Sequence, residues 1–251
     1  MATPVSVGEL QQAWIAVARG DFRTLPPAEP WPKGSSEQRL LVVGVAGQMG
    51  TSTVALALAE DRGAARLVDC APTSTSGLVG VCDRELGRDA NGWWEGHRRG
   101  LLVQRSPLHT AAAPDACPQP PAVEAGLTVV DAGFPAPAIA ASPGWLADLL
   151  NEPTVPVVVV TRCSVPGMRL LASTLHLIQG SDRQVRVIVQ GPSRQRWPRG
   201  VQLPTATGDP TTTVTTLPTL GAFATAGLGA PDLPAAITAA VHACLQKGSL
   251  R

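Results

Sequence analysis

The segment from Gly44 to Thr53 constrains the fold of this chain more than any other part of it. It follows the apolar run Leu40–Val43 and precedes the apolar run Val54–Ala59. This order predicts a strand, a turn that contains glycines, and a helix, which is the layout of a phosphate-binding loop. Glycines let backbone amides approach phosphate oxygens closely, and the start of the helix points its positive end at the anion. The alternative is an ordinary strand-to-helix turn.

One residue in this segment departs from the usual pattern. Thr51 stands where such loops carry a lysine, and the only lysines of the chain, Lys33 and Lys247, are remote from it in sequence. A charge-assisted hydrogen bond contributes roughly 1.5–3 kcal/mol. Its loss should weaken nucleotide binding on the order of tenfold to several hundredfold. Phosphoryl transfer depends on the same positive charge, so we expect slow hydrolysis unless an arginine compensates.

The rest of the chain alternates short apolar runs with helical patterns. This alternation predicts an α/β fold with a doubly wound, mainly parallel sheet flanked by helices. Residues 191–216 are rich in Pro, Gly and Thr and are expected to be irregular. The expected strands are Leu40–Val45, Arg66–Asp69, Leu101–Gln104, Leu127–Asp131, Val155–Thr161, Val185–Gln190 and Leu217–Leu220, and the expected helices are Thr51–Glu60, Pro166–Ile178 with Leu170 inward, and one capped by Asp232.

The N-terminal part differs from this pattern. We expect an amphipathic helix within residues 1–23, a proline-rich linker over residues 24–37, and the α/β domain over residues 38–247. The apolar stripe of the helix includes Leu10 and Trp14. Either this stripe packs on the domain of the same chain, or Trp14 anchors a protein partner.

Composition limits the classes of function. The net charge of +1 gives no strong signal for nucleic-acid binding. The arginines around Trp197 could contact nucleic-acid phosphates, or they could belong to an ordinary solvated loop. No apolar run approaches the roughly 20 residues that span a bilayer, so no transmembrane segment is expected. The five cysteines lack a C-x-x-C pair and the histidines are isolated, which disfavours a zinc site. Their odd number and the lack of a signal peptide favour reduced thiols in the cytoplasm.

Two carboxylates each follow a predicted strand. Asp69 and Asp131 should lie near the loop, because ligands of doubly wound sheets bind beyond the carboxyl ends of the strands. The Ser52 hydroxyl and Asp131 are candidate Mg²⁺ ligands. If the protein hydrolyses a nucleotide, Asp69 and Asp131 are the candidate catalytic residues, since either could position an attacking water.

These motifs resemble the ParA/MinD branch of the SIMIBI class of P-loop NTPases, whose loop reads K-G-G-x-G-K-[ST]-T. The match covers residues 46–53 with both lysines lost, and Gly47, Gly50, Ser52 and Thr53 agree. Residues 68–72 resemble the family strand that ends in Asp-x-Asp-Pro, with Ala71 replacing the second Asp, and residues 129–133 resemble the Walker B end. The resemblance implies weakened binding of ATP and Mg²⁺ and allows a homodimer. The cofactor-binding residues would be Gly47, Gly50, Thr51, Ser52 and Thr53.

Within this branch the loop is most similar to that of TadZ/CpaE-like proteins, which often have G-G-x-G-x-[ST]-T. That family places secretion or pilus machinery at particular cell sites. Many of its members carry an N-terminal receiver-like domain, for which the first 37 residues here are too short. The abundance of Ala, Arg and Pro is typical of a high-GC genome, such as that of an actinobacterium.

A second unusual segment pairs tryptophans with arginines. Trp93, Trp94, Arg98 and Arg99 could form a partner-binding patch, or the indoles could cover the sheet edge within a loop. Arg98, Arg99 and Arg105 are the arginines that could replace the missing lysine charge.

Three functions are compatible with these observations. The leading hypothesis is a catalytically impaired ParA/MinD-like protein that regulates or localises a bacterial membrane-associated machine of the secretion, conjugation or pilus type. It would be cytoplasmic and recruited peripherally to the membrane by a protein partner. The second is a slow but active ATPase switch in which an arginine replaces the lysine. The third is a nucleotide-independent scaffold.

Overall fold

The structure is a computed structural model that describes residues 14, 36–110, 113–123, 125–178, 183–219, 227–228 and 232–246. The predicted N-terminal helix and most of the predicted linker lie outside these residues. Trp14 is the exception; it is helical and its side chain is 72% exposed.

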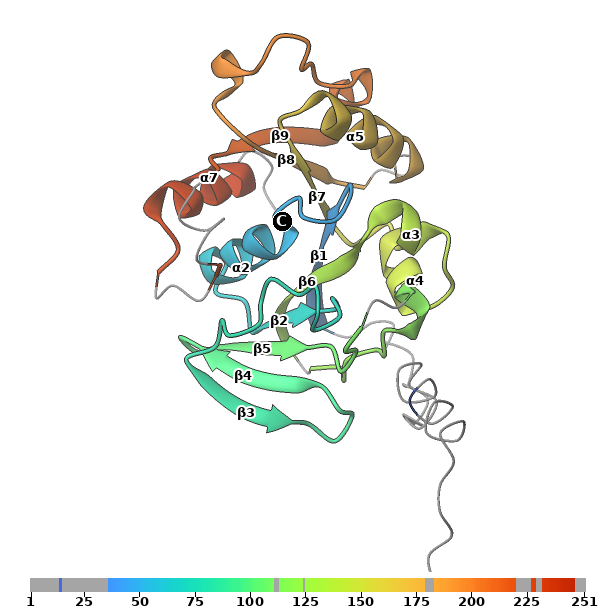
Figure 1. Cartoon of the computed structure of the whole chain (residues 1–251), viewed down its shortest axis with the longest axis vertical. Coiled ribbons are helices and arrows are strands. Elements are labelled where there is room, and N and C mark those ends of the chain that lie inside the picture. Colours follow the sequence, from blue (N-terminus) through green and yellow to red (C-terminus); the bar gives the residue numbers. More distant parts are fainter. Residues whose placement is uncertain are drawn as a thin grey trace, which may run out of the picture.

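Within the described residues, nine strands form one sheet in the order β3-β4-β5-β2-β6-β1-β7-β8-β9 (Figure 1). All pairs from β5 to β9 are parallel, and β3 and β4 add an antiparallel hairpin at one edge. The strands are β1 Ser36–Gly44, β2 Arg66–Asp69, β3 Arg84–Arg88, β4 Trp94–Arg98, β5 Leu101–Arg105, β6 Ala125–Pro135, β7 Val157–Arg162, β8 Val185–Gln190 and β9 Thr212–Leu217.

Helices cover both faces of this sheet. One face packs against α2 (Thr51–Asp61) and α7 (Ala235–Gln246), and the other against α3 (Ala136–Ala140), α4 (Trp145–Asn151) and α5 (Val165–Ile178). Three short 3-10 helices lie in the connections: η1 Pro114–Ala116, η2 Arg194–Arg196 and η3 Thr205–Gly208. The predicted fold class, a doubly wound and mainly parallel sheet flanked by helices, is confirmed. Among the described helices, none has the length and apolar character needed to cross a bilayer.

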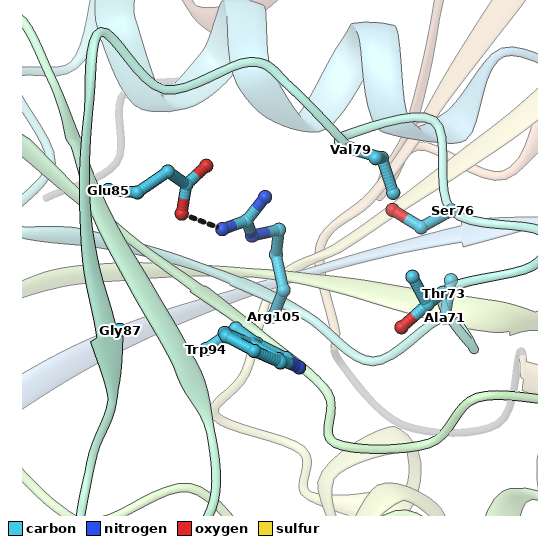
Figure 2. A pocket seen from close by; sticks show the side chains of 8 residues that line it. All are labelled: Ala71, Thr73, Ser76, Val79, Glu85, Gly87, Trp94 and Arg105. Atoms are coloured by element: carbon cyan, nitrogen blue, oxygen red, sulfur yellow. Dashed lines mark hydrogen bonds and ion pairs between the residues drawn. The ribbon is translucent and has the colours of Figure 1, made fainter.

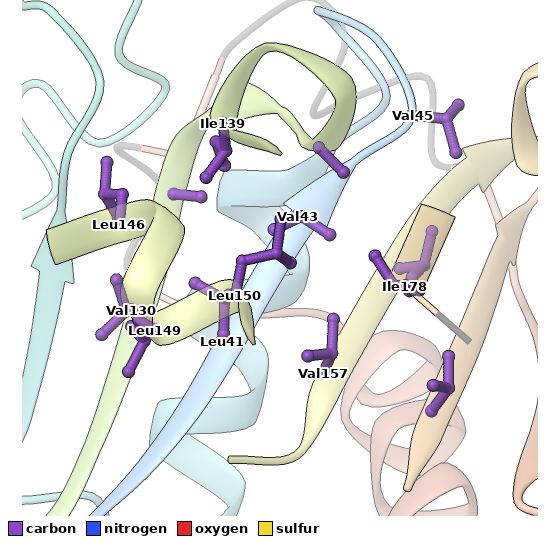
Figure 3. Packing of buried hydrophobic residues seen from close by; sticks show 14 of the residues in the cluster. Leu41, Val43, Val45, Val130, Ile139, Leu146, Leu149, Leu150, Val157 and Ile178 are labelled. Atoms are coloured by element: carbon purple, nitrogen blue, oxygen red, sulfur yellow. The ribbon is translucent and has the colours of Figure 1, made fainter. Parts of the chain in front are cut away.

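The central strands are apolar on both faces because each face is covered. In β1, Leu41 and Val43 pack in the core beside α3 to α5, while Leu40 and Val42 pack in the core beside α2 and α7. Figure 3 shows Leu41 and Val43 packed with residues of α3, α4 and β7. Such continuous apolar runs are typical of buried parallel strands, and they are why the sequence predicted the middle of the sheet correctly.

The sheet edges and the short helices differ from the predictions. The last strand, β9, spans Thr212–Leu217 and so lies mostly in the segment expected to be irregular, not at Leu217–Leu220 where a strand was expected. It is rich in threonine and half-buried, so it lacks the apolar run that marks a central strand. The hairpin β3–β4 and the helices α3 and α4 were not predicted. Leu170 was expected to face inward but is 40% exposed. Helix α7 begins at Ala235, so Asp232 does not cap it.

Candidate functional site

The predicted strand, turn and helix are present at the end of β1. The strand ends at Gly44 and α2 begins at Thr51, directly after Gly50, whose φ of 84° is left-handed. The turn is fixed at both ends by backbone hydrogen bonds, from Val45 N to Val160 O (3.0 Å) and from Val54 N to Gly50 O (3.1 Å). The glycine pattern therefore has a structural cause as well as a candidate binding role.

A cleft of about 780 Å³ opens at this turn. Its walls come from the loop after β1, residues 71–77, the end of β6, and the carboxyl ends of β7, β8 and β9, and Leu228 and Ile237 also line it. The five predicted cofactor-binding residues all line it: Gly47, Gly50, Thr51, Ser52 and Thr53. This position, beyond the carboxyl ends of parallel strands, is where such sheets bind ligands.

The two predicted carboxylates lie side by side, since Asp69 and Asp131 are register partners in β2 and β6. Asp69 Oδ1 accepts a hydrogen bond from Ala71 N (3.0 Å), and the Ser76 hydroxyl donates to Asp69 Oδ2. Asp131 lines the cleft, and its Oδ1 accepts from Gly133 N (3.3 Å). Asp131 Oδ2 is buried and has no hydrogen-bond partner within the part of the chain that the structure describes. That oxygen is suited to accept a bond from water or to bind a cation.

Burial changes the acidity of both groups. It raises the pKa of Asp69 to about 7, and the charge of Asp131 adds to this rise. Burial also raises the pKa of Asp131 to about 6, although the Ser52 hydroxyl and the Gly133 amide act in the opposite direction. A divalent cation beside Asp131 would favour the ionised form. No group of three or more His, Cys, Asp or Glu side chains suited to a metal occurs in the described ranges. Magnesium would therefore rely on Ser52, Asp131, water and phosphate oxygens.

The three arginines expected to replace the lysine charge are engaged elsewhere. Arg98 Nε lies 2.6 Å from Glu60 Oε1, Arg99 pairs with Asp232, and Arg105 pairs with Glu85. None of them lines the cleft. Arg105 instead lines a second pocket of about 280 Å³ between the hairpin and residues 71–79, where Figure 2 shows it reaching toward Glu85. The structure therefore gives no support to the hypothesis that Arg98, Arg99 or Arg105 replaces the lysine charge.

The cationic side chain that does line the cleft is Arg162, at the end of β7. Arg162 was not among the site residues predicted from the sequence. A signal existed, because Arg162 directly follows a buried valine-rich strand, and residues at the carboxyl ends of such strands face the ligand.

The predicted patch of tryptophans and arginines is only partly at the surface. Trp93 is 0% exposed and Arg98 is 1% exposed, so the prediction that these two bind a partner is wrong. These two side chains are buried because the hairpin β3–β4 pairs with β5 at the sheet edge. Arg98 also donates a hydrogen bond to Val81 O (3.0 Å). Trp94 is half-buried with the Arg88 guanidinium 4.4 Å from its ring centroid, and Arg99 is exposed.

Two glycines of the loop differ in how closely other atoms approach them. A Cβ atom added to Gly50 would lie 2.0 Å from Gln190 Nε2, at a positive φ, whereas a Cβ added to Gly47 would meet no atom within 4 Å. We expect Gly50→Ala to lower the free energy of unfolding by about 1–3 kcal/mol, and Gly47→Ala to change it by less than about 0.5 kcal/mol. Urea titrations of both variants measure this, and equal losses would contradict it.

No protein-family model and no curated protein matches this chain. Among solved structures, a chain of the MinC:MinD cell division protein complex from Aquifex aeolicus is similar, with a TM-score of 0.53 and 15% identity over 85% of this chain and 98% of that chain. A candidate plasmid partition protein from Borrelia burgdorferi B31, bound to AMPPNP, has a TM-score of 0.45 and 10% identity over 84% of this chain and 97% of that one, too low to support an argument. The first likeness establishes the fold.

Proposed function

We propose that this chain is a nucleotide-responsive regulatory or localising protein of the ParA/MinD type in which hydrolysis is impaired. It would act through a protein partner in a bacterial membrane-associated machine for secretion, conjugation or pilus assembly, as TadZ/CpaE-like proteins do. The observation that carries the proposal is a complete strand–loop–helix frame with Thr51, instead of lysine, as the first residue of α2.

This frame retains most of the features that bind phosphate. The start of α2 and residues of the loop line the cleft, where backbone amides and the positive end of a helix can bind an anion. Asp131 Oδ2 lacks a protein partner within the described ranges. Thr51 cannot supply charge, and its Oγ1 lies only 2.7 Å from where a Cβ of Gly44 would be, so its hydroxyl turns toward the base of the loop. Binding should therefore persist at reduced affinity, while stabilisation of the transition state is lost.

Restoring the lysine tests this proposal. We expect Thr51→Lys to tighten binding of Mg²⁺-ATP about tenfold or more, because it adds one charge-assisted contact. Calorimetric titration with Mg²⁺-ATP and Mg²⁺-ADP measures the affinity, and a phosphate-release assay measures turnover. Ser173→Lys, on the exposed face of α5, adds the same charge away from the cleft and should leave affinity within about twofold. Readily measurable turnover by the unchanged protein, as fast as that of Thr51→Lys, would refute impaired hydrolysis.

A slow ATPase switch is the second candidate, favoured by Arg162, which lines the same cleft as Asp131. In this case Asp131→Asn should abolish the residual turnover, because the carboxylate would no longer hold the cation or orient water. Unchanged turnover in this variant would exclude the switch. If the unchanged protein bound no nucleotide at millimolar concentration, the scaffold hypothesis would replace both.

Trp14, Trp94 and Arg99 are the members of the predicted partner-binding set that are not fully buried, and we propose that they contribute to contact with the partner. Recruitment to the membrane would be peripheral, through that partner. A homodimer that closes over the cleft is compatible with this arrangement and is tested by sedimentation with and without Mg²⁺-ATP.

A further inference from the structure

Arg162 is the only Lys or Arg among the described residues that line the cleft. Its side chain is exposed, and it forms no ion pair with any described residue. It thus differs from Arg98, Arg99 and Arg105, each of which is paired with a carboxylate. Whether this unpaired guanidinium can bind an anion in the cleft depends on the side of the sheet on which the Arg162 side chain projects.

Strand register gives that direction. Arg162 and Gln190 are register partners in β7 and β8. Side chains alternate between the faces of a strand, so Arg162 shares a face with Val160, and Gln190 shares a face with Ile188. Val160 and Ile188 are both buried in the core beside α2 and α7. Arg162 and Gln190 therefore project on the side of the sheet where α2 begins.

The position of Gln190 shows how far a side chain from this edge of the strands extends toward the loop after β1. Its Nε2 would lie 2.0 Å from a Cβ atom added to Gly50, so its amide already rests against the last residue of the loop. Strand β7 lies between β8 and β1, from which the loop emerges. Arg162 is consequently one strand spacing, about 4.8 Å, closer to β1 than Gln190 is. Its side chain is also longer, so the guanidinium can reach the anion site in front of the loop amides.

We propose that Arg162 supplies the positive charge that Thr51 does not, so that the cleft binds the polyphosphate of a nucleotide with a guanidinium from β7 in place of an ammonium from α2. This inference rests on the proposed function, because it assigns the cation of the same site. A guanidinium presents its donors in a planar fork that can bind two phosphate oxygens at once, which a single ammonium does not.

The test compares two exposed arginines in the full-length chain. Arg162→Gln removes the proposed contact, and Arg169→Gln, on the exposed side of α5 and outside the cleft lining, removes the same charge. We expect Arg162→Gln to weaken calorimetric binding of Mg²⁺-ATP and of inorganic tripolyphosphate about tenfold or more. Arg169→Gln should change either affinity by less than about twofold. Thermal melts should be alike for both variants.

The binding results for these variants either support or overturn the role of Arg162. Restoration of Mg²⁺-ATP binding by adding Thr51→Lys to Arg162→Gln would support it, because either residue would then supply the charge. The inference would be overturned if Arg162→Gln and Arg169→Gln changed the affinity for Mg²⁺-ATP equally, or if Arg162→Gln bound it as tightly as the unchanged protein. Either result would leave the proposed function standing. Absence of binding by the unchanged protein would overturn both.

Discussion

Replacing Arg66 with alanine is expected to lower the free energy of unfolding by about 3–5 kcal/mol, because it breaks a buried ion pair and leaves the other charge without its partner. Arg66 lies in β2, and its NH2 is 2.8 Å from Glu37 Oε1 in β1. The side chains of Arg66 and Glu37 are 1% and 0% exposed. An uncompensated carboxylate at such a site carries a large desolvation cost.

The other donors of Arg66 join further strands. Its Nε donates to Thr128 Oγ1 in β6 (3.0 Å), and its NH1 donates to Gln104 Oε1 in β5 (2.8 Å) and to Pro121 O (2.6 Å). The Thr128 hydroxyl also donates to Glu37 Oε1. A single side chain thus connects β1, β2, β5 and β6 at the end of the sheet opposite the cleft. Alanine would leave several buried acceptors unsatisfied together, and each such group adds to the loss.

Urea denaturation measures this effect. Arg84→Ala, on the exposed edge strand β3, is the matched control and should change stability by no more than about 0.5 kcal/mol. The double variant Arg66→Met with Glu37→Gln should recover part of the loss, because no unpaired charge remains. A loss below about 1 kcal/mol for Arg66→Ala would show that the network contributes little to stability.

The same residue illustrates where sequence patterns succeed and where they fail. The strand Arg66–Asp69 was predicted from its apolar pair and its terminal Asp, and the structure has the strand with those bounds. Its buried arginine was not anticipated, because charged residues are usually exposed. Only the pairing of β2 with its neighbours brings Glu37, Gln104 and Thr128 to Arg66, from positions that are 29 to 62 residues away in sequence.

In the candidate site, too, some residues follow from local sequence spacing and others only from strand pairing. The loop and Asp131 follow local rules of spacing, so the sequence located them in one cleft. The cation of the site does not follow from local spacing. Arg162 enters through strand order, because β7 pairs with β1 although more than a hundred residues separate them along the chain. Arg98 was misassigned for the corresponding reason: its partner Glu60 belongs to α2 and is 38 residues away.

Asp131→Asn should stabilise the ligand-free protein at neutral and alkaline pH. Burial raises the pKa of Asp131 to about 6 and that of Asp69 to about 7 in the folded state. The folded protein therefore holds protons that the unfolded chain releases above about pH 4, and stability must fall as pH rises from about 4 to about 7. Asparagine cannot ionise and also removes the charge that raises the pKa of Asp69. We expect a gain of about 1–3 kcal/mol at pH 8 that vanishes near pH 4.

Urea denaturation between pH 4 and pH 8 measures this prediction, with Asp209→Asn as a control of opposite sign. Hydrogen bonds from Thr211 lower the pKa of the half-buried Asp209, so its replacement should reduce stability at neutral pH. With Mg²⁺ and nucleotide, the unchanged protein should become more stable than Asp131→Asn. A cation that binds the ionised carboxylate stabilises the unchanged protein and not the variant. Parallel pH profiles for the two proteins would contradict the raised pKa of Asp131 in the folded state.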